Sequence, residues 1–306
     1  QADVRAAVAG RPDRLMAGTH GPSGDPADGI AILGAGLAGL SLALQLVEAG
    51  VEAPITLIEP RSRYTDDRTW GFWEVAAHPF TDQVAERWPA WRVTTPAARH
   101  LQAAAVPYVR LPAGRVYAEA RARLGRAHNV SIRQGARVLG VDGGTVTLAD
   151  GTRLRAGVIY DGRPPDPVTL AARRGPRLVQ QFVGRRVRTD RPAFTPGVAD
   201  LMDFRLGQDH GIAFLYVLPT GPCEALVEAT VFAGRPVEWD AIESLLADGL
   251  DRRCAEAGAR VRAVVAREQG AIPMVPGLGR SRAPPCGVIP IGTRAGAPRG
   301  STGYAY

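Results

Sequence analysis

The apolar positions near the start of the sequence follow the pattern of a strand, a helix and a second strand. Residues 30–33 form a continuous apolar run, apolar side chains recur at helical spacing from Leu37 to Val47, and residues 55–58 form a second run. Short runs of this kind are typical of buried strands, and the helical spacing places the apolar side chains on one face. The pattern predicts a βαβ unit.

Further along the chain, the pattern predicts two groups of strands separated by residues 164–176, a crossing rich in Pro and Arg. The runs before the crossing predict a three-stranded meander and a final strand, and the runs after it predict an antiparallel sheet. One amphipathic helix is expected before the meander and one after the last strand. The expected strands are 130–133, 136–141, 145–148, 152–154, 156–160, 178–189, 198–205, 212–218 and 224–232, and the helices are 115–124 and 239–257.

The order of these elements predicts an α/β protein in which a Rossmann-type domain is interrupted by an antiparallel sheet. We expect residues 29–176 and 270–306 to form the nucleotide-binding domain and residues 177–269 to form the substrate domain. Residues 1–28 mix Arg, Ala, Gly and Pro without a continuous apolar core, so we expect a disordered leader there.

A GxGxxG sequence joins the first strand to the first helix. Gly34 would let the chain turn sharply, Gly36 would let the backbone approach a pyrophosphate, and Gly39 would let helix and strand pack closely. The amides at the helix start, Leu37 and Ala38, would then donate hydrogen bonds to the anion. The motif's place between a strand and a helix predicts a dinucleotide site.

Two acidic residues at strand ends refine the identity of the nucleotide. Glu59 ends the second strand, where it can accept hydrogen bonds from a ribose hydroxyl and would repel an additional phosphate. This favours FAD or NAD over NADP. Asp161-Gly162 follows the meander, an order often seen in FAD proteins of the hydroxylase type, although Asp-Gly is also common in plain turns.

The composition indicates a globular protein with a basic surface. The 306 residues are 45% hydrophobic and 22% charged, and a net charge of +7 comes with many Arg and no Lys. We see no basic cluster interleaved with aromatic residues, so the anionic surface of a membrane is the expected partner and nucleic acid is not. No apolar run is long enough to span a bilayer. We therefore expect a cytoplasmic protein that associates peripherally with the inner face of the membrane.

The cysteines do not indicate a metal site. Cys223, Cys254 and Cys286 are far apart in the sequence and lack the spacing of metal ligands. They suggest a reducing compartment, and we expect no bound metal.

Two features suggest chemistry on a hydrophobic substrate. Trp70 and Phe72 follow a polar loop and could either fold into the core or form an aromatic wall beside a ligand. Glu228 lies in an apolar strand whose alternation puts Leu226, Glu228 and Thr230 on one face. Burial there would raise the pKa of Glu228 and keep it protonated near neutrality, as a general acid requires. Alternatively, Glu228 could face solvent or pair with an Arg.

A series of segments matches the motifs of one known family in the same order. The segments are Gly34–Gly39, Thr69–Phe72, Gln181–Gly184, Leu201–Asp203, Phe214–Pro219, Leu226–Thr230, Gly270–Met274 and Ser301–Tyr304. Their combination resembles the bacterial lycopene beta-cyclases, which are FAD-dependent flavoproteins of carotenoid biosynthesis. The resemblance covers residues 29–306 and is far more specific than any single motif.

The resemblance implies that linear lycopene is converted to a beta-ring carotene without net redox change. Glu228 matches the carboxylate that the family uses to protonate a terminal double bond. Reduced FAD would stabilise the resulting carbocation, with NADPH or NADH as the reductant. The implied substrate residues are Trp70, Phe72, Asp203, Tyr216 and Thr230. The implied FAD residues, besides Gly34, Gly36, Leu37, Ala38, Gly39 and Glu59, are Asp161, Gly162, Gly292, Thr302 and Gly303.

The sequence departs from the family pattern at three places. Ala229 stands where a second carboxylate is common, Asp67-Arg68 precedes Thr69 where His or Asn is usual, and the sequence stops at Tyr306 where the family continues with a helical portion. The main alternative is an FAD-dependent monooxygenase or reductase with the same two-domain plan. Enzymes of that class often have Gly-Asp in the C-terminal flavin segment. This chain has Gly292-Thr293 there, which counts against the alternative. The other alternative is a non-catalytic nucleotide-binding or membrane-associated scaffold.

Overall fold

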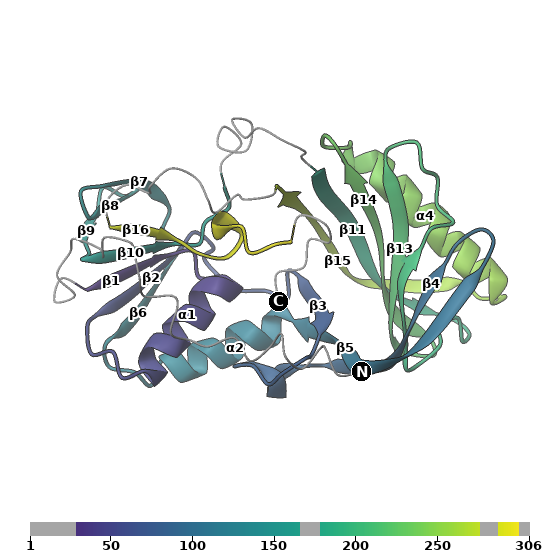
Figure 1. Ribbon diagram of the computed structural model, residues 1–306, viewed down its shortest axis with the longest axis horizontal. Helices are drawn as coiled ribbons and strands as arrows, with labels where there is room; N and C mark the ends of the chain where they lie inside the picture. The colour runs from purple at the N-terminus through teal and green to yellow at the C-terminus, as the bar shows by residue number, and fades with distance from the viewer. Residues whose placement is uncertain (1–28, 166–177, 276–286, 300–306) are drawn as a thin grey trace, which may run out of the picture.

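The computed structural model describes residues 29–165, 178–275 and 287–299, and two sheets dominate it (Figure 1). The first sheet has five parallel strands in the order β16-β10-β1-β2-β6. Its strands are β1 (Ile30–Leu33), β2 (Ile55–Glu59), β6 (Val130–Gln134), β10 (Val158–Asp161) and β16 (Val288–Pro290). The predicted βαβ unit is confirmed, since α1 (Leu37–Glu48) connects β1 to β2.

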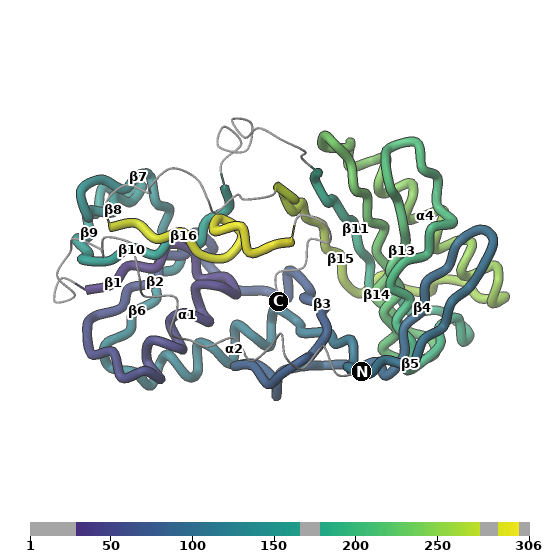
Figure 2. Tube along the Cα trace, viewed as in Figure 1, coloured from purple at the N-terminus to yellow at the C-terminus, as the bar shows by residue number. Residues whose placement is uncertain are grey.

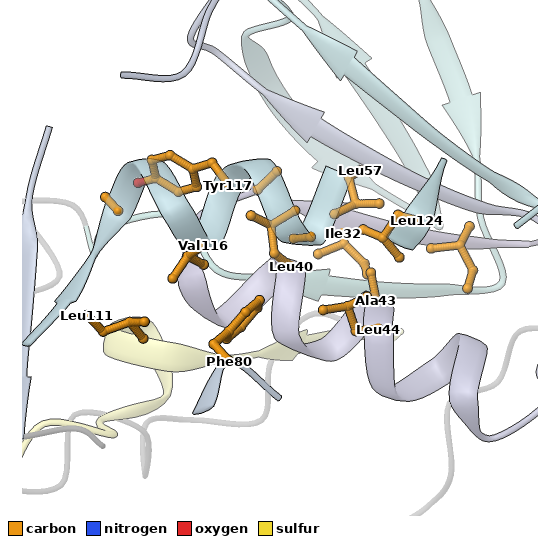
Figure 3. Close-up of a cluster of buried hydrophobic side chains, with 14 of the residues drawn as sticks. Ile32, Leu40, Ala43, Leu44, Leu57, Phe80, Leu111, Val116, Tyr117 and Leu124 are labelled. Carbon is orange, nitrogen blue, oxygen red and sulfur yellow. The ribbon is translucent and has the colours of Figure 1, made fainter. Parts of the chain in front are cut away.

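Helices α1 and α2 (Ala113–Leu124) pack together on one face of the parallel sheet. Figure 3 shows their shared core, in which Leu40, Val116 and Tyr117 meet Ile32 and Leu57 of the strands. All five side chains are at most 1% exposed. On the other face, the predicted meander forms a small sheet of β7 (Val138–Asp142), β8 (Thr145–Leu148) and β9 (Arg153–Arg155).

The second sheet has eight strands in the order β15-β11-β14-β13-β12-β4-β5-β3, paired antiparallel except for β12 with β4. The predicted strands are present as β11 (Leu178–Thr189), β12 (Val198–Asp203), β13 (Ile212–Gly221) and β14 (Glu224–Ala233). The other four are β3 (Thr69–Trp73), β4 (Glu86–Thr94), β5 (Arg99–Pro112) and β15 (Val261–Met274). The predicted combination of a Rossmann-type domain with an antiparallel sheet is confirmed.

Helix α4 (Trp239–Glu256) covers one face of this second sheet. The apolar side of α4 packs against Val183 and Val187 of β11 and Val227 and Ala229 of β14. The opposite face of β14 carries Leu226, which belongs to a separate cluster rich in aromatic side chains. The alternation predicted for β14 is therefore confirmed, and Glu228 lies on the face opposite α4.

Several strands join the eight-stranded sheet from unexpected parts of the chain. Residues 69–112 supply β3, β4 and β5, with only a short 3₁₀ turn, η3 (Thr81–Gln83), between β3 and β4. Residues 270–274, which we expected with the nucleotide-binding domain, lie in β15. After it, β16 returns to the parallel sheet, as the yellow end of the tube in Figure 2 shows. None of the helices in the described ranges could span a membrane.

Candidate active site

The glycine turn after β1 has the geometry that a dinucleotide requires. Gly34 has a φ of 91°, a value that favours glycine, and a Cβ at Gly39 would lie 2.1 Å from the Gly34 carbonyl oxygen. Around Gly36, in contrast, nothing lies within 4 Å of the Cβ position. Gly36 is the N-cap of α1, so the amides of the first helical turn have no intrahelical acceptors. Open space beside such amides fits a phosphate group.

Glu59 is held beside this turn as an ionised carboxylate. Its Oε2 accepts a hydrogen bond from the amide of Ala35 at 2.9 Å, and its Oε1 accepts one from Nε of Arg61 at 2.8 Å. Burial raises the pKa of Glu59, but the hydrogen bonds and charge of Arg61 outweigh it and the pKa is lowered. Arg61 in turn lies over the rings of Tyr64 and Tyr117, each 4.9 Å away. An ionised carboxylate in this place is suited to accept a hydrogen bond from a ribose hydroxyl.

Distant segments complete the surroundings of the turn. The amide of Gly162 donates to Leu33 at 2.8 Å, and a Cβ at Gly292 would lie 2.8 Å from the Cβ of Ala38. Gly292 begins the 3₁₀ turn η5 (Gly292–Ala295). The carboxylate of Asp161 accepts hydrogen bonds from Arg163, with Nε at 2.9 Å. Thr302 and Gly303 lie outside the described residues. The described residues thus fit a dinucleotide such as FAD.

Glu228 lies on β14 in the middle of the eight-stranded sheet, with Gly184 of β11 on one side and Tyr216 of β13 on the other. Its side chain is partly exposed, but protein atoms surround it closely. This burial raises the pKa of Glu228 well above its usual value, and a neighbouring carboxyl, Glu268, raises it further. Both effects favour the protonated form of Glu228.

Glu268 reaches Glu228 across a glycine. Gly184 pairs with Glu228 on one side and with Glu268 of β15 on the other. A Cβ at Gly184 would lie 2.8 Å from Cγ of Glu228 and 3.0 Å from Cγ of Glu268. Because Gly184 leaves this space empty, the two carboxyl groups meet in a hydrogen bond.

Glu268 also touches the far edge of the sheet. Its carboxyl hydrogen-bonds with Thr69 of β3 and lies near the guanidinium of Arg110 on β5. Because β3 and β15 are opposite edges of the sheet, the sheet must curl for this contact to form (Figure 1). A small hollow of about 20 Å³ lies at the seam and is lined by Asp66, Thr69, Arg110 and Glu268, among other residues. That volume suits one water molecule and excludes a larger ligand.

Comparison with known proteins places the chain in a family. The family model described as "Lycopene cyclase protein" matches residues 29–306. The chain belongs to the lycopene cyclase family. It is 31% identical over 289 residues to the lycopene beta-cyclase of Paracoccus sp. (strain N81106 / MBIC 01143), which covers 90% of this chain and 69% of that protein. The resemblance stated from the sequence is confirmed.

Solved structures show the same fold at low sequence identity. A geranylgeranyl bacteriochlorophyll reductase-like protein from Thermoplasma acidophilum is similar with a TM-score of 0.68 and 14% identity, over 90% of this chain and 73% of that one. A probable FAD-dependent monooxygenase from Pseudomonas aeruginosa is similar with a TM-score of 0.57 and 15% identity. The similarity covers 87% of this chain and 78% of that one. This chain therefore shares its architecture with both proteins.

The substrate residues expected from the family lie in three different surroundings. Tyr216 is directly opposite Glu228, and Thr230 is two residues further along the same face. Trp70 and Phe72 instead pack into the core of the parallel sheet, where Phe72 is 2% exposed and Trp70 meets Tyr117 edge to face. Asp203 lies at the end of β12, where hydrogen bonds from Arg205 outweigh burial and lower its pKa. Only Tyr216 and Thr230 are next to Glu228.

The sequence reasoning missed Glu268 and most of the aromatic face. Glu268 precedes the family segment Gly270–Met274 by two residues, but the strand that carries it was not predicted. Only the pairing of β11 with both β14 and β15 brings it to Glu228. The face around Glu228 also includes Trp88, Tyr108 and Phe214. Recognising the alternating residues of β13 as one face would have found Phe214 together with Tyr216.

Proposed function

We propose that this protein is a lycopene beta-cyclase in which Glu228 is the general acid. The observation that carries the proposal is a carboxyl on a sheet face rich in aromatic side chains, whose pKa is raised well above its usual value by burial and by Glu268. The lycopene beta-cyclase of Paracoccus supports the choice of substrate. The reaction is an isomerisation, because the linear carotene and its ring product have the same atoms.

In the proposed mechanism, Glu228 donates its proton to the terminal double bond of the carotene and leaves a tertiary carbocation. A neighbouring double bond attacks the cation and closes a six-membered ring. Loss of a ring proton to a carboxylate then forms the ring alkene. General acid catalysis of this kind contributes roughly 10²- to 10⁴-fold to a rate. The first proton is restored by the last step, so the reaction needs no external acid.

The aromatic face has two tasks in this mechanism. Tyr216 and Phe214, whose ring centroids are 5.2 Å apart, lie on the face of Glu228 and exclude water that would trap a cation. Their π faces can also stabilise positive charge. We further propose that Trp70, Phe72, Asp203 and Thr230 contribute to the substrate region, as the family resemblance implies.

The proposed cofactor is FAD, bound at the glycine turn by the amides of Gly36, Leu37 and Ala38, with Gly34 and Gly39 shaping the turn. Glu59 would bind the ribose, and Asp161, Gly162, Gly292, Thr302 and Gly303 would contact the rest of the cofactor. When bound and kept reduced by NADPH or NADH, FAD would supply negative charge near the carbocation without transferring electrons to it. The flavoprotein fold of the solved relatives supports this assignment.

A pigment assay tests the proposal. Expression of the wild-type chain in a lycopene-accumulating bacterium should yield cyclic carotene, and Glu228→Gln should reduce cyclisation by at least about 10²-fold, with flavin still bound. The matched control is Glu224→Gln, four residues earlier on β14, where the carboxylate pairs with Arg188 at 2.7 Å. This control should cyclise lycopene like the wild type.

Two results would contradict the proposal. Full cyclisation by Glu228→Gln would remove this residue from the mechanism. Oxidation of NADPH coupled to consumption of oxygen, with no cyclic product, would instead favour the monooxygenase class that shares the fold.

A further inference from the structure

We propose that Glu228 and Glu268 form a carboxyl pair that holds one proton, with Glu268 as the positioning residue that keeps the proton on Glu228. This inference rests on the proposed function, since it assigns a second carboxyl to the same acid. The second carboxyl comes from another strand, whereas position 229, where the family pattern has its second carboxylate and this chain has Ala229, faces α4.

The backbone register makes the pair possible. Adjacent strands lie about 4.8 Å apart, so β14 and β15 are roughly 10 Å apart with β11 between them. Two Glu side chains can span that separation only if the residue between them has no side chain. Gly184 stands there, and both Cγ atoms lie within 3.0 Å of its missing Cβ. At the neighbouring position on the same face the space beside the glycine is filled, because the ring of Phe182 on β11 lies over Gly270 on β15.

The surroundings of the two carboxyls differ in a way that decides where the proton lies. Burial raises the pKa of Glu268 as well, and Asp66 adds to this, but Thr69 and the positive charge of Arg110 lower it, whereas no such group lowers the pKa of Glu228. Arg186 of β11 and Arg267 of β15 line the same hollow. Tyr216 and Gly184 lie beside Glu228 in the sheet, and Leu226 and Thr230 flank it on the same face of β14; none of these four residues carries a charge. Ionisation is therefore easier at Glu268, and Glu228 keeps the proton.

Arg110 is fixed in a position from which it can offset the charge of Glu268. Its Nε donates to Glu86 at 2.5 Å, and its side chain is 8% exposed. Glu86 and Glu268 thus share one buried guanidinium. A guanidinium stays charged at any pH where proteins fold, so its field at Glu268 does not switch off.

The proton balance of the proposed reaction follows from this arrangement. At the start the pair carries one proton, bonded to Glu228 and directed at Glu268. Transfer to the less substituted carbon of the terminal double bond breaks the O–H bond of Glu228, forms a C–H bond and leaves two carboxylates opposite one tertiary carbocation. The ring proton that is lost at the end returns to the pair. Glu268 therefore holds the acidic proton in place before the reaction and adds negative charge opposite the cation.

The first experiment follows the pH dependence of cyclisation in Glu268→Gln, a change that removes the charge and keeps the size. The alkaline limit of activity should move to lower pH by about one unit or more, because the neighbouring negative charge is gone. Well below that limit, activity should stay within a few-fold of the wild type. Glu224→Gln should keep the wild-type profile. An unchanged pH profile in Glu268→Gln, or an equal loss of activity at every pH, would contradict the proposed carboxyl pair.

The second experiment needs no catalysis and no folded Glu268 variant. Infrared spectra of the wild-type protein with its flavin should show the C=O band of one protonated buried carboxyl at neutral pH and a second one as the pH falls. Glu228→Gln should lack the first band, because Glu228 holds the proton. If the first band persists in Glu228→Gln, another group holds the proton and the proposed pair is wrong. Two protonated carboxyls, or none, at neutral pH would do the same.

The two experiments separate failure of the pair from failure of the proposed function. If the wild type cyclises no carotene but the infrared bands titrate as a pair, the proposed function is wrong and the pair stands. If Glu228→Gln abolishes cyclisation while Glu268→Gln leaves the pH profile unchanged, the function stands and the pair is wrong.

Discussion

At the scale of single residues, the main finding is a carboxyl, Glu228, whose pKa the fold raises well above its usual value. The sequence could place Glu228 among apolar neighbours and on the right face of its strand. It could not place Glu268, because the two residues meet only through β11. The raised pKa of Glu228 comes first from burial and then from this partner. A protonated carboxyl inside a sheet has consequences for stability as well as for catalysis.

The stability of the protein should depend on pH through Glu228. Unfolded Glu ionises near pH 4.3, while the folded residue keeps its proton to higher pH. Between these two pKa values the folded state binds more protons, so stability falls as pH rises, by about 1.4 kcal/mol per pH unit for one proton. Glu228→Gln should lack this fall, and its free energy of unfolding relative to the wild type should increase with pH.

Urea denaturation of both proteins at a series of pH values measures this difference. Glu224→Gln serves as the control, because Glu224 lies near the end of β14 and pairs with arginines there. It should follow the wild-type dependence. A constant offset between Glu228→Gln and the wild type at all pH values would show that Glu228 is ionised in the folded protein.

At the scale of elements, periodicity predicted the strands and helices that alternate cleanly. It found β1, α1 and β2 and the long strands β11, β13 and β14. It missed β3, β4, β5 and β15, because their exposure does not alternate in a simple way. The first half of β5 is largely exposed and its second half is buried, so no single period describes it. Whether such a segment forms a strand depends on its partner strands, and those partners are distant in the sequence.

Gly36, which caps α1, and Gly39, in the first turn of α1, should respond differently to the same substitution. Gly36→Ala puts a methyl group into open space at an ordinary φ of −82°, so stability should change by no more than about 0.5 kcal/mol. It should nevertheless weaken FAD binding, because the methyl group occupies the place of a phosphate. Gly39→Ala collides with the Gly34 carbonyl and should cost about 1–3 kcal/mol of stability as well.

The measurements are the flavin absorbance per polypeptide and the urea midpoint of each variant. The two variants are controls for each other, since they make the same chemical change in one turn. A Gly36→Ala protein that binds FAD as tightly as the wild type would contradict the assignment of this turn to the cofactor.

At the scale of the whole molecule, the eight-stranded sheet curls until its edge strands meet. The contact between Thr69 of β3 and Glu268 of β15 marks the seam. One face of the curled sheet is covered by α4, and the other carries the aromatic residues and Glu228. The carboxyl pair itself lies on β14 and β15, while Thr69 and Arg110 beside Glu268 come from the first half of the chain.

The net charge of +7 leads to a prediction about membranes. We propose that the protein associates peripherally with the inner, anionic face of the membrane, where a carotene would be dissolved. Each Arg near an anionic surface contributes about 1 kcal/mol at low salt. Sedimentation with vesicles should show binding to anionic lipid, little binding to neutral lipid, and loss of binding as salt shortens the Debye length. Equal binding to both lipids, or to neither, would contradict this proposal.

The pairing of β16 with β10 has a consequence for synthesis of the protein. Residues 178–274, which include the strands with Glu228 and Glu268, leave the ribosome before Val288–Pro290. Until then the outer edge of β10 has no partner in the parallel sheet, and an unpaired edge can join another chain. Gly292, which packs against Ala38 at the glycine turn, is made later still. A nascent chain therefore contains Glu228 and Glu268 before Gly292, and the proposed FAD site would be complete only after synthesis has passed Gly292.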